Sequence, residues 1–173
     1  MPLAVTHVLL TIIIVDLYRD YVTRHKKYFS LHTIMIAGVA GLLPDIDIPL
    51  SWILDYLGIQ IELLQHGGIA HTPFFGLIFL IPAFILHSRK KYKESAYFFV
   101  LCFGILLHLF LDIVIGGGGH NGIMLFWPLL GNGYYLGIVS SAGLANLPAA
   151  LDAIILILWL WHEEKKHKIK DFI

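Results

Sequence analysis

The sequence predicts an all-α, polytopic membrane protein: a helix bundle of about five spans with one broken re-entrant or interfacial segment. Of its 173 residues, 58% are hydrophobic and only 14% are charged. A soluble domain is close to half apolar and a quarter charged. The apolar residues also fall in long runs, and the basic residues fall in short segments between those runs. These observations exclude an ordinary soluble domain.

The expected spans are the apolar runs between polar or helix-breaking residues. The first run is short for a span of about 20 residues, and Pro44 and Pro49 end the second. Four glycines at 116–119 break the fourth. The segment 123–141 is apolar but interrupted by proline and glycine, so we expect it to be re-entrant or interfacial. The five expected spans are residues 3–17, 31–47, 72–86, 95–115 and 146–161.

The basic residues predict the orientation. All twelve Lys and Arg lie at 19–27, 89–93 and 165–170. With five spans these segments share one side, which the positive-inside rule makes cytoplasmic. The N-terminus is then outside and the C-terminus inside. We therefore expect one multi-pass domain in the cell membrane, residues 1–162, followed by a basic cytoplasmic tail, residues 163–173.

The outer side is expected to carry a set of histidines and aspartates and no lysine or arginine. His108 and Asp112 are four residues apart, so they share one face of a helix inside the run 95–115. An ionisable residue inside a span indicates a functional site by default. At 1.5 Å per residue, His108 would lie roughly 10 Å below the outer interface. The candidate residues are His7, Asp45, Asp47, His66, His71, His108 and Asp112.

Imidazole and carboxylate groups are the protein ligands of zinc, manganese and iron. The set therefore predicts a divalent metal centre facing outward, with zinc as the first choice and manganese or iron as alternatives. An open position at such an ion carries an activated water, which is the nucleophile of a hydrolase. We expect Asp45 or Asp47 to bind metal and to accept the proton of that water. The other five residues would hold the ion, with His7 completing the set.

The same residues also have interpretations without catalysis. The turn 44–47 suits the end of a helix, and His108 suits a direct hydrogen bond with Asp112. A scaffold of this kind would lock helices together and bind no metal. A metal-ion or proton transporter or sensor is a further alternative. It would give a role to two acids inside apolar runs, Asp16 and Asp152, for which the hydrolase hypothesis has none.

Several blocks of sequence also occur in a characteristic order and spacing: Thr6–Leu10, Leu42–Asp47, His66–Thr72, Gly104–Asp112 and Leu125–Pro128. They resemble the YdjM-like family of membrane-bound, metal-dependent hydrolases. That family is similar in turn to zinc-dependent phospholipase C and related nucleases, whose histidines and aspartates hold zinc ions that cut phosphoesters. The resemblance implies that the seven candidate residues are metal ligands or their neighbours. It also implies a phosphoester in a lipid or lipid-linked substrate.

Two positions depart from the family's pattern. Ile48 stands where the family often has histidine, and Gly67 stands where it often has arginine. The first departure costs a ligand, and the second costs a phosphate or structural contact. The chain also has no second His-x3-Glu pair of the phospholipase type, so we expect one or two ions rather than three. As partners we expect membrane lipid and a lipid-linked substrate, and no nucleic acid.

Overall fold

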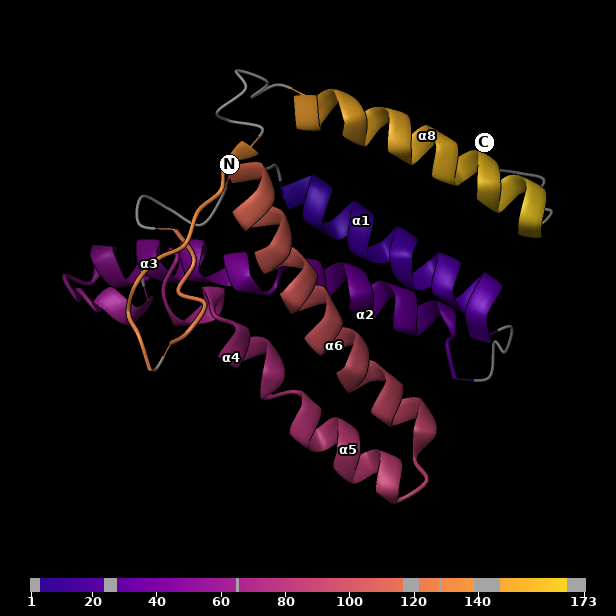
Figure 1. Ribbon diagram of the computed structural model, residues 1–173, viewed down its shortest axis with the longest axis horizontal. Helices are drawn as coiled ribbons and strands as arrows, with labels where there is room; N and C mark the ends of the chain where they lie inside the picture. Colours follow the sequence, from indigo (N-terminus) through magenta and orange to yellow (C-terminus); the bar gives the residue numbers. More distant parts are fainter. Residues whose placement is uncertain are drawn as a thin grey trace.

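The computed structural model describes residues 4–23, 28–64, 66–116, 122–127, 129–138 and 147–167 (Figure 1). Its described elements are helical, as the sequence predicts, apart from one isolated bridge between Ile123 and Tyr134. The α-helices are α1 (Ala4–Leu17), α2 (Leu31–Leu42), α3 (Asp47–Tyr56), α4 (Pro73–Leu77), α5 (Leu80–Ser88), α6 (Tyr92–Leu111) and α8 (Leu147–His167). Two π-helical turns are η1 (Tyr18–Thr23) and η5 (Asp112–Gly116). Three 3₁₀-helical turns are η2 (Pro44–Ile46), η3 (Glu62–Leu64) and η4 (Ile69–His71).

Fewer helices could cross a membrane than the sequence led us to expect. Among the described residues, one helix is long and apolar enough, the continuous segment Tyr92–Ile115 of α6 and η5. A second is obtained if α2 and the segment Pro44–Tyr56, which meet at 54°, form one broken span. The expectation of about five spans is therefore corrected to one or two. For two of the expected spans the reason is length: α1 has 14 residues and Pro73–Ser88 is also short, whereas a span needs about 20.

Helices α2 and α6 form the centre of the bundle, with α1 packed on α2 and with α4 and α5 packed on α6 (Figure 1). Small residues allow these backbones to approach closely. A Cβ atom at Gly104 on α6 would overlap Ala40 on α2. A Cβ atom at Gly41 would lie 2.7 Å from both the carbonyl oxygen of His7 and Oγ1 of Thr11. The start of α1, the end of α2 and the last turns of α6 therefore meet at one end of the bundle.

The described part of the segment 123–141 forms a loop that packs against the end of α6. Ile123 and Tyr134 exchange two backbone hydrogen bonds of 2.9 Å. The amide of Leu136 donates to the carbonyl oxygen of Ile113 at 3.2 Å, which ties the loop to η5. None of the described residues of this segment belongs to a helix that could span a membrane. Residues 128 and 139–141 lie outside the described residues.

Helix α8 lies along α1 (Figure 1). Contacts at or beside this interface involve the two acids for which the hydrolase hypothesis has no role, Asp16 on α1 and Asp152 on α8. Oγ1 of Thr6 donates to Oδ2 of Asp152 at 2.8 Å, and both side chains are buried. Farther along the same helices, Nε1 of Trp159 donates to Oδ2 of Asp16 at 3.3 Å. Arg19 pairs with Oδ1 of Asp16 at 2.6 Å. Both acids therefore take part in holding α8 against α1.

The basic segments lie toward one side of the bundle. Figure 1 places the loop between α5 and α6, the end of α1 and the end of α8 toward the right of the view, away from α3. Of the expected tail, residues 163–167 continue α8. The rest of the tail lies outside the described residues, as do residues 24–27 of the first basic segment.

Candidate metal centre

All seven residues that the sequence singles out lie in one cluster, at the end of the bundle where α1 begins and α6 ends. Pro44 starts η2 at the 54° bend after α2, and this bend carries the two aspartates of the turn to the end of α6. The cluster contains His7 on α1, Asp45 on η2, Asp47 at the start of α3, His66 in the loop before η4, His71 on η4, His108 on α6 and Asp112 on η5.

Two histidines, His71 and His108, each direct Nε2 at oxygens of both Asp45 and Asp112. Nε2 of His108 lies 3.2 Å from Oδ2 of Asp112 and 3.6 Å from Oδ1 of Asp45. Nε2 of His71 lies 3.5 Å from the same Asp45 oxygen and 3.7 Å from the same Asp112 oxygen. Two ligands of one tetrahedral zinc ion are roughly 3.4 Å apart. These distances therefore suit groups that share a metal ion.

The backbone of α2 fixes the orientation of His108. Its Nδ1 lies 2.8 Å from the carbonyl oxygen of Gly41. A carbonyl oxygen can only accept, so Nδ1 carries the hydrogen and Nε2 of the neutral ring carries a lone pair. Nε2 is buried, has no hydrogen-bond partner and faces the oxygens of Asp112 and Asp45. A lone pair facing carboxylates is stabilised only by a cation or a proton between them, so this atom fits a metal ligand.

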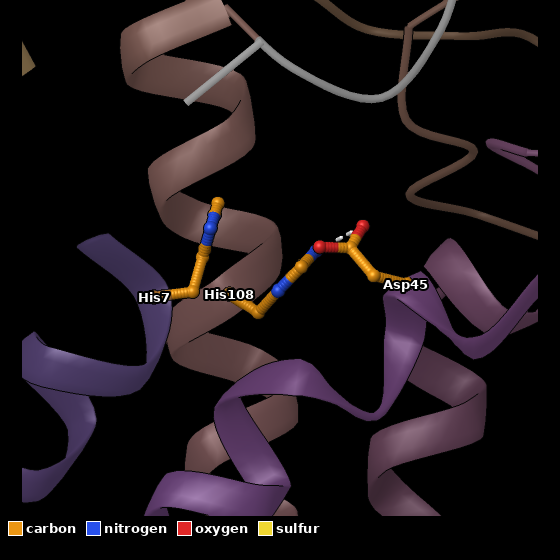
Figure 2. Close-up of side chains that lie close together, drawn as sticks. All are labelled: His7, Asp45 and His108. Carbon is orange, nitrogen blue, oxygen red and sulfur yellow. Dashed lines mark ion pairs between the residues drawn. The ribbon is translucent and has the colours of Figure 1, made fainter. Parts of the chain in front are cut away.

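His7 lies beside His108 (Figure 2). The two rings stack with their centroids 3.9 Å apart. Nε2 of His7 lies 3.3 Å from Oδ1 of Asp112, and neither of its buried ring nitrogens has a hydrogen-bond partner. Ligand atoms of His7, Asp45 and His108 all lie within 4.8 Å of one another. The dashed line in Figure 2 marks the pair formed by Asp45 and His108.

Asp47 occupies a different place from the other two aspartates. Its Oδ2 lies 2.9 Å from Nδ1 of His71, and its Oδ1 lies 3.0 Å from Nδ1 of His66. Asp47 is in none of the groups of three whose ligand atoms lie within 4.8 Å of one another. A carboxylate that receives the Nδ1 hydrogen of a histidine turns Nε2 of that ring toward a metal. In this geometry Asp47 hydrogen-bonds with Nδ1 of His66, lies against Nδ1 of His71, and stays outside the groups of ligand atoms that could share one ion.

The electrostatics of the cluster favour a cation. The three aspartates form ion pairs only with histidines among the described residues, and no Lys or Arg reaches them. Burial lowers the pKa of His71, but the contacts with Asp45 and Asp47 outweigh it and raise that pKa to about 9. The carboxylates thus favour a positive charge at this ring. Either a proton or a metal ion supplies it.

The sequence as a whole matches the model of a protein family. The model of the YdjM inner membrane protein family matches residues 1–169, which is nearly the whole chain. The chain belongs to the YdjM family. No curated protein and no solved structure matches the chain. Membership identifies a membrane protein, and the buried His and Asp groups of this YdjM protein could hold a metal ion.

The candidate metal centre of this YdjM protein is open on one side. The side chains of Asp45 and His66 keep 17% and 20% of their surface exposed. Those of the other five cluster residues are at most 4% exposed. A molecule from outside the protein therefore reaches the cluster past the η2 turn and the loop before η4, and Asp45 is the first inner carboxylate that it meets.

Sequence reasoning missed the part that Gly41 plays in the YdjM centre. Its carbonyl oxygen sets the tautomer of His108, and its missing side chain lets α1 approach α2 beside His7. The four small residues Ala37, Gly38, Ala40 and Gly41 of α2 are a signal for close helix packing. That signal predicts a tight contact, but it does not say which ligand the contact positions.

Proposed function

We propose that this YdjM-family protein is a membrane-embedded hydrolase that uses a divalent metal, with zinc as the first choice, to cut phosphoester bonds in a lipid or lipid-linked substrate. The observation that carries the proposal is the meeting of ligand atoms of His71, His108 and Asp112 within 4.8 Å of one another, with Oδ1 of Asp45 within 3.6 Å of both histidine nitrogens. The Nε2 atoms of both histidines lack hydrogen-bond partners there. Two nitrogens and two carboxylates are a donor set that zinc, manganese and iron accept.

The position of each cluster residue indicates its proposed role at the metal. His71, His108 and Asp112 are almost fully buried and hold the ion, and His7 completes the set from α1. Asp47 keeps His71 and His66 oriented from behind. A bound divalent ion lowers the pKa of a coordinated water and stabilises negative charge on a phosphoryl oxygen.

Asp45 is the candidate general base. It is the carboxylate of the inner group with the larger exposed fraction, so one of its oxygens can meet water while Oδ1 faces the two histidines. A base must lie within hydrogen-bond reach of the proton that it accepts. Asp45 satisfies this at the open side of the centre, whereas both oxygens of Asp47 face histidine nitrogens. Asp45 would therefore accept the proton of the attacking water.

A substrate within the membrane fits the position of the centre. The cluster lies at the end of Tyr92–Ile115, the segment long and apolar enough to cross a membrane, so the reacting group of a lipid could reach it. In the proposed topology the protein crosses the membrane once or twice, through Tyr92–Ile115 and the bent pair of α2 and Pro44–Tyr56. The basic ends of the bundle face the cytoplasm, and the metal centre and the N-terminus face outward.

The transporter hypothesis loses its particular support. It drew on two acids without partners, but Asp152 accepts a hydrogen bond from Thr6. Asp16 is paired with Arg19 and Trp159. These contacts give both acids a structural role between α1 and α8, so neither requires an ion path.

The test is phosphoester hydrolysis by the purified protein in mixed lipid–detergent micelles, with phospholipids and lipid-linked phosphates as substrates. We expect activity that a chelator removes and that His108→Ala reduces at least 100-fold without loss of folding. The matched control is His32→Ala, which removes an exposed histidine of α2 outside the cluster. Full activity in His108→Ala would overturn the proposal. Transport of metal ions or protons by the protein, without hydrolysis, would favour the transporter hypothesis.

A further inference from the structure

A second feature lies at the other end of the bundle from the metal centre. It is an apolar cavity of about 660 Å³, bounded by the end of α1, the residues before α2, the end of α5 and the first half of α6. Aromatic side chains form much of its wall, among them Tyr18, Phe29, Tyr92, Phe99 and Phe103. Its volume falls within the range of about 300–1,000 Å³ that small-molecule sites occupy.

The cavity is open to the surface of the bundle. Ile14, Tyr18 and Phe103 line it and remain 39%, 46% and 38% exposed. One of its few polar side chains, Ser95, already donates its hydroxyl to the carbonyl oxygen of Ala83 at 2.9 Å. An occupant would therefore meet mainly hydrocarbon and aromatic surface. A flexible apolar chain that enters from the surrounding membrane fits this wall.

Cations border the cavity on one side. Arg89, Lys90, Lys91 and Lys93 surround the turn between α5 and α6, and all four are exposed. In the part of the chain that the structure describes, no carboxylate pairs with them. Tyr92, which lines the cavity, lies between two of the lysines in sequence. An apolar cavity and an unpaired basic loop are thus adjacent.

We propose that this cavity binds one acyl chain of an anionic phospholipid while the basic loop 89–93 binds the lipid phosphate. Membrane-adjacent clusters of Lys and Arg attract anionic headgroups. The loop supplies that attraction, and the aromatic wall holds the chain. This lipid is separate from the substrate proposed above, because the cavity lies toward the opposite ends of α1 and α6 from His7 and His108. The proposal does not depend on the metal centre.

Native mass spectrometry of the detergent-purified protein tests the proposal, with equal amounts of phosphatidylglycerol and phosphatidylcholine of the same chain length. We expect at least tenfold more bound phosphatidylglycerol than phosphatidylcholine. Ile14→Trp, which fills the cavity from a partly exposed position, should reduce the bound phosphatidylglycerol about tenfold. Lys91→Gln/Lys93→Gln should abolish the preference for the anionic lipid.

Two matched controls separate the cavity from general effects. Ile81→Trp enlarges an exposed residue of α5 that does not line the cavity, and Lys165→Gln/Lys166→Gln removes two basic residues of α8. Both should bind lipid as the parent does. Equal binding of the two lipids by the parent would overturn the proposal, as would unchanged phosphatidylglycerol binding by a folded Ile14→Trp variant, with folding checked by thermal unfolding.

Discussion

The Nδ1–H group of His108 donates to the carbonyl oxygen of Gly41 at 2.8 Å, across the contact between α6 and α2. This hydrogen bond leaves Nε2 as the atom that faces Asp112 and Asp45. The packing of two helices and the chemistry of the centre are therefore linked through one backbone oxygen. A change that separates α2 from its neighbours should affect both.

Gly41→Ala should weaken both folding and metal binding. The added methyl group would lie 2.7 Å from the backbone oxygen of His7, which cannot turn away as a flexible side chain would. Overpacking of this kind costs about 1–3 kcal/mol of unfolding free energy. Thermal unfolding and metal titration would measure the two effects. Gly131→Ala is the control, since nothing lies within 4 Å of its added Cβ, and parental metal affinity in Gly41→Ala would contradict the account.

Asp47→Asn should weaken metal binding without abolishing it. Asp47 contacts the Nδ1 atoms of His66 and His71, and loss of such an orienting carboxylate lowers metal affinity about 10–100-fold. Asp112→Asn is the comparison, because it removes an inner carboxylate and should leave no measurable metal. Competition with a fluorescent chelator would give both affinities. If the two variants lost metal equally, Asp47 would be a direct ligand.

Thr6→Val should loosen the attachment of α8 and leave the metal stoichiometry unchanged. It replaces the hydroxyl that donates to Asp152 with a methyl group of similar shape, so a buried carboxylate loses its partner. The expected loss of unfolding free energy is about 1–3 kcal/mol. Thr6→Ser keeps the hydroxyl and should behave nearly as the parent. A loss of bound metal in Thr6→Val, at parental stability, would show that this contact belongs to the centre.

Metal binding should release a proton below pH 9. The pKa of His71, ordinarily near 6.5, is raised to about 9 by Asp45 and Asp47 despite burial. At pH 7 the metal-free ring is therefore protonated, and an ion at Nε2 must displace that proton. Apparent affinity should rise with pH, by up to about tenfold per unit, and level off above pH 9. Calorimetry in buffers of different ionisation enthalpy would count the protons, and an affinity independent of pH would exclude His71 as a ligand.

The sequence was sufficient to find the members of the cluster. The spacing of His108 and Asp112 alone places them on one helix face. The basic segments were assigned to one side of the membrane, and the other His and Asp residues of the cluster were therefore assigned to the opposite side. Their arrangement required three dimensions. Nothing in the local sequence shows that Asp47 faces two histidines while Asp45, two residues earlier, faces the centre.

The number of spans was overestimated because hydropathy does not show where a helix ends. The apolar run that begins with α1 gives only 14 residues of α-helix before η1, and the run after Leu31 bends at Pro44. The contact of Thr6 with Asp152 could not be predicted either. It joins residues 146 positions apart, and only the docking of α8 on α1 brings them together.

The most direct measurement is elemental analysis by mass spectrometry of the protein purified without chelator, beside His108→Ala/Asp112→Ala. The account predicts one or two equivalents of zinc, manganese or iron in the parent and none in the folded variant, because the variant loses one nitrogen and one carboxylate of the inner group. No metal in the parent after metal is added back, or equal metal in both proteins, would contradict a metal centre and leave the His–Asp pairs as a helix-locking scaffold.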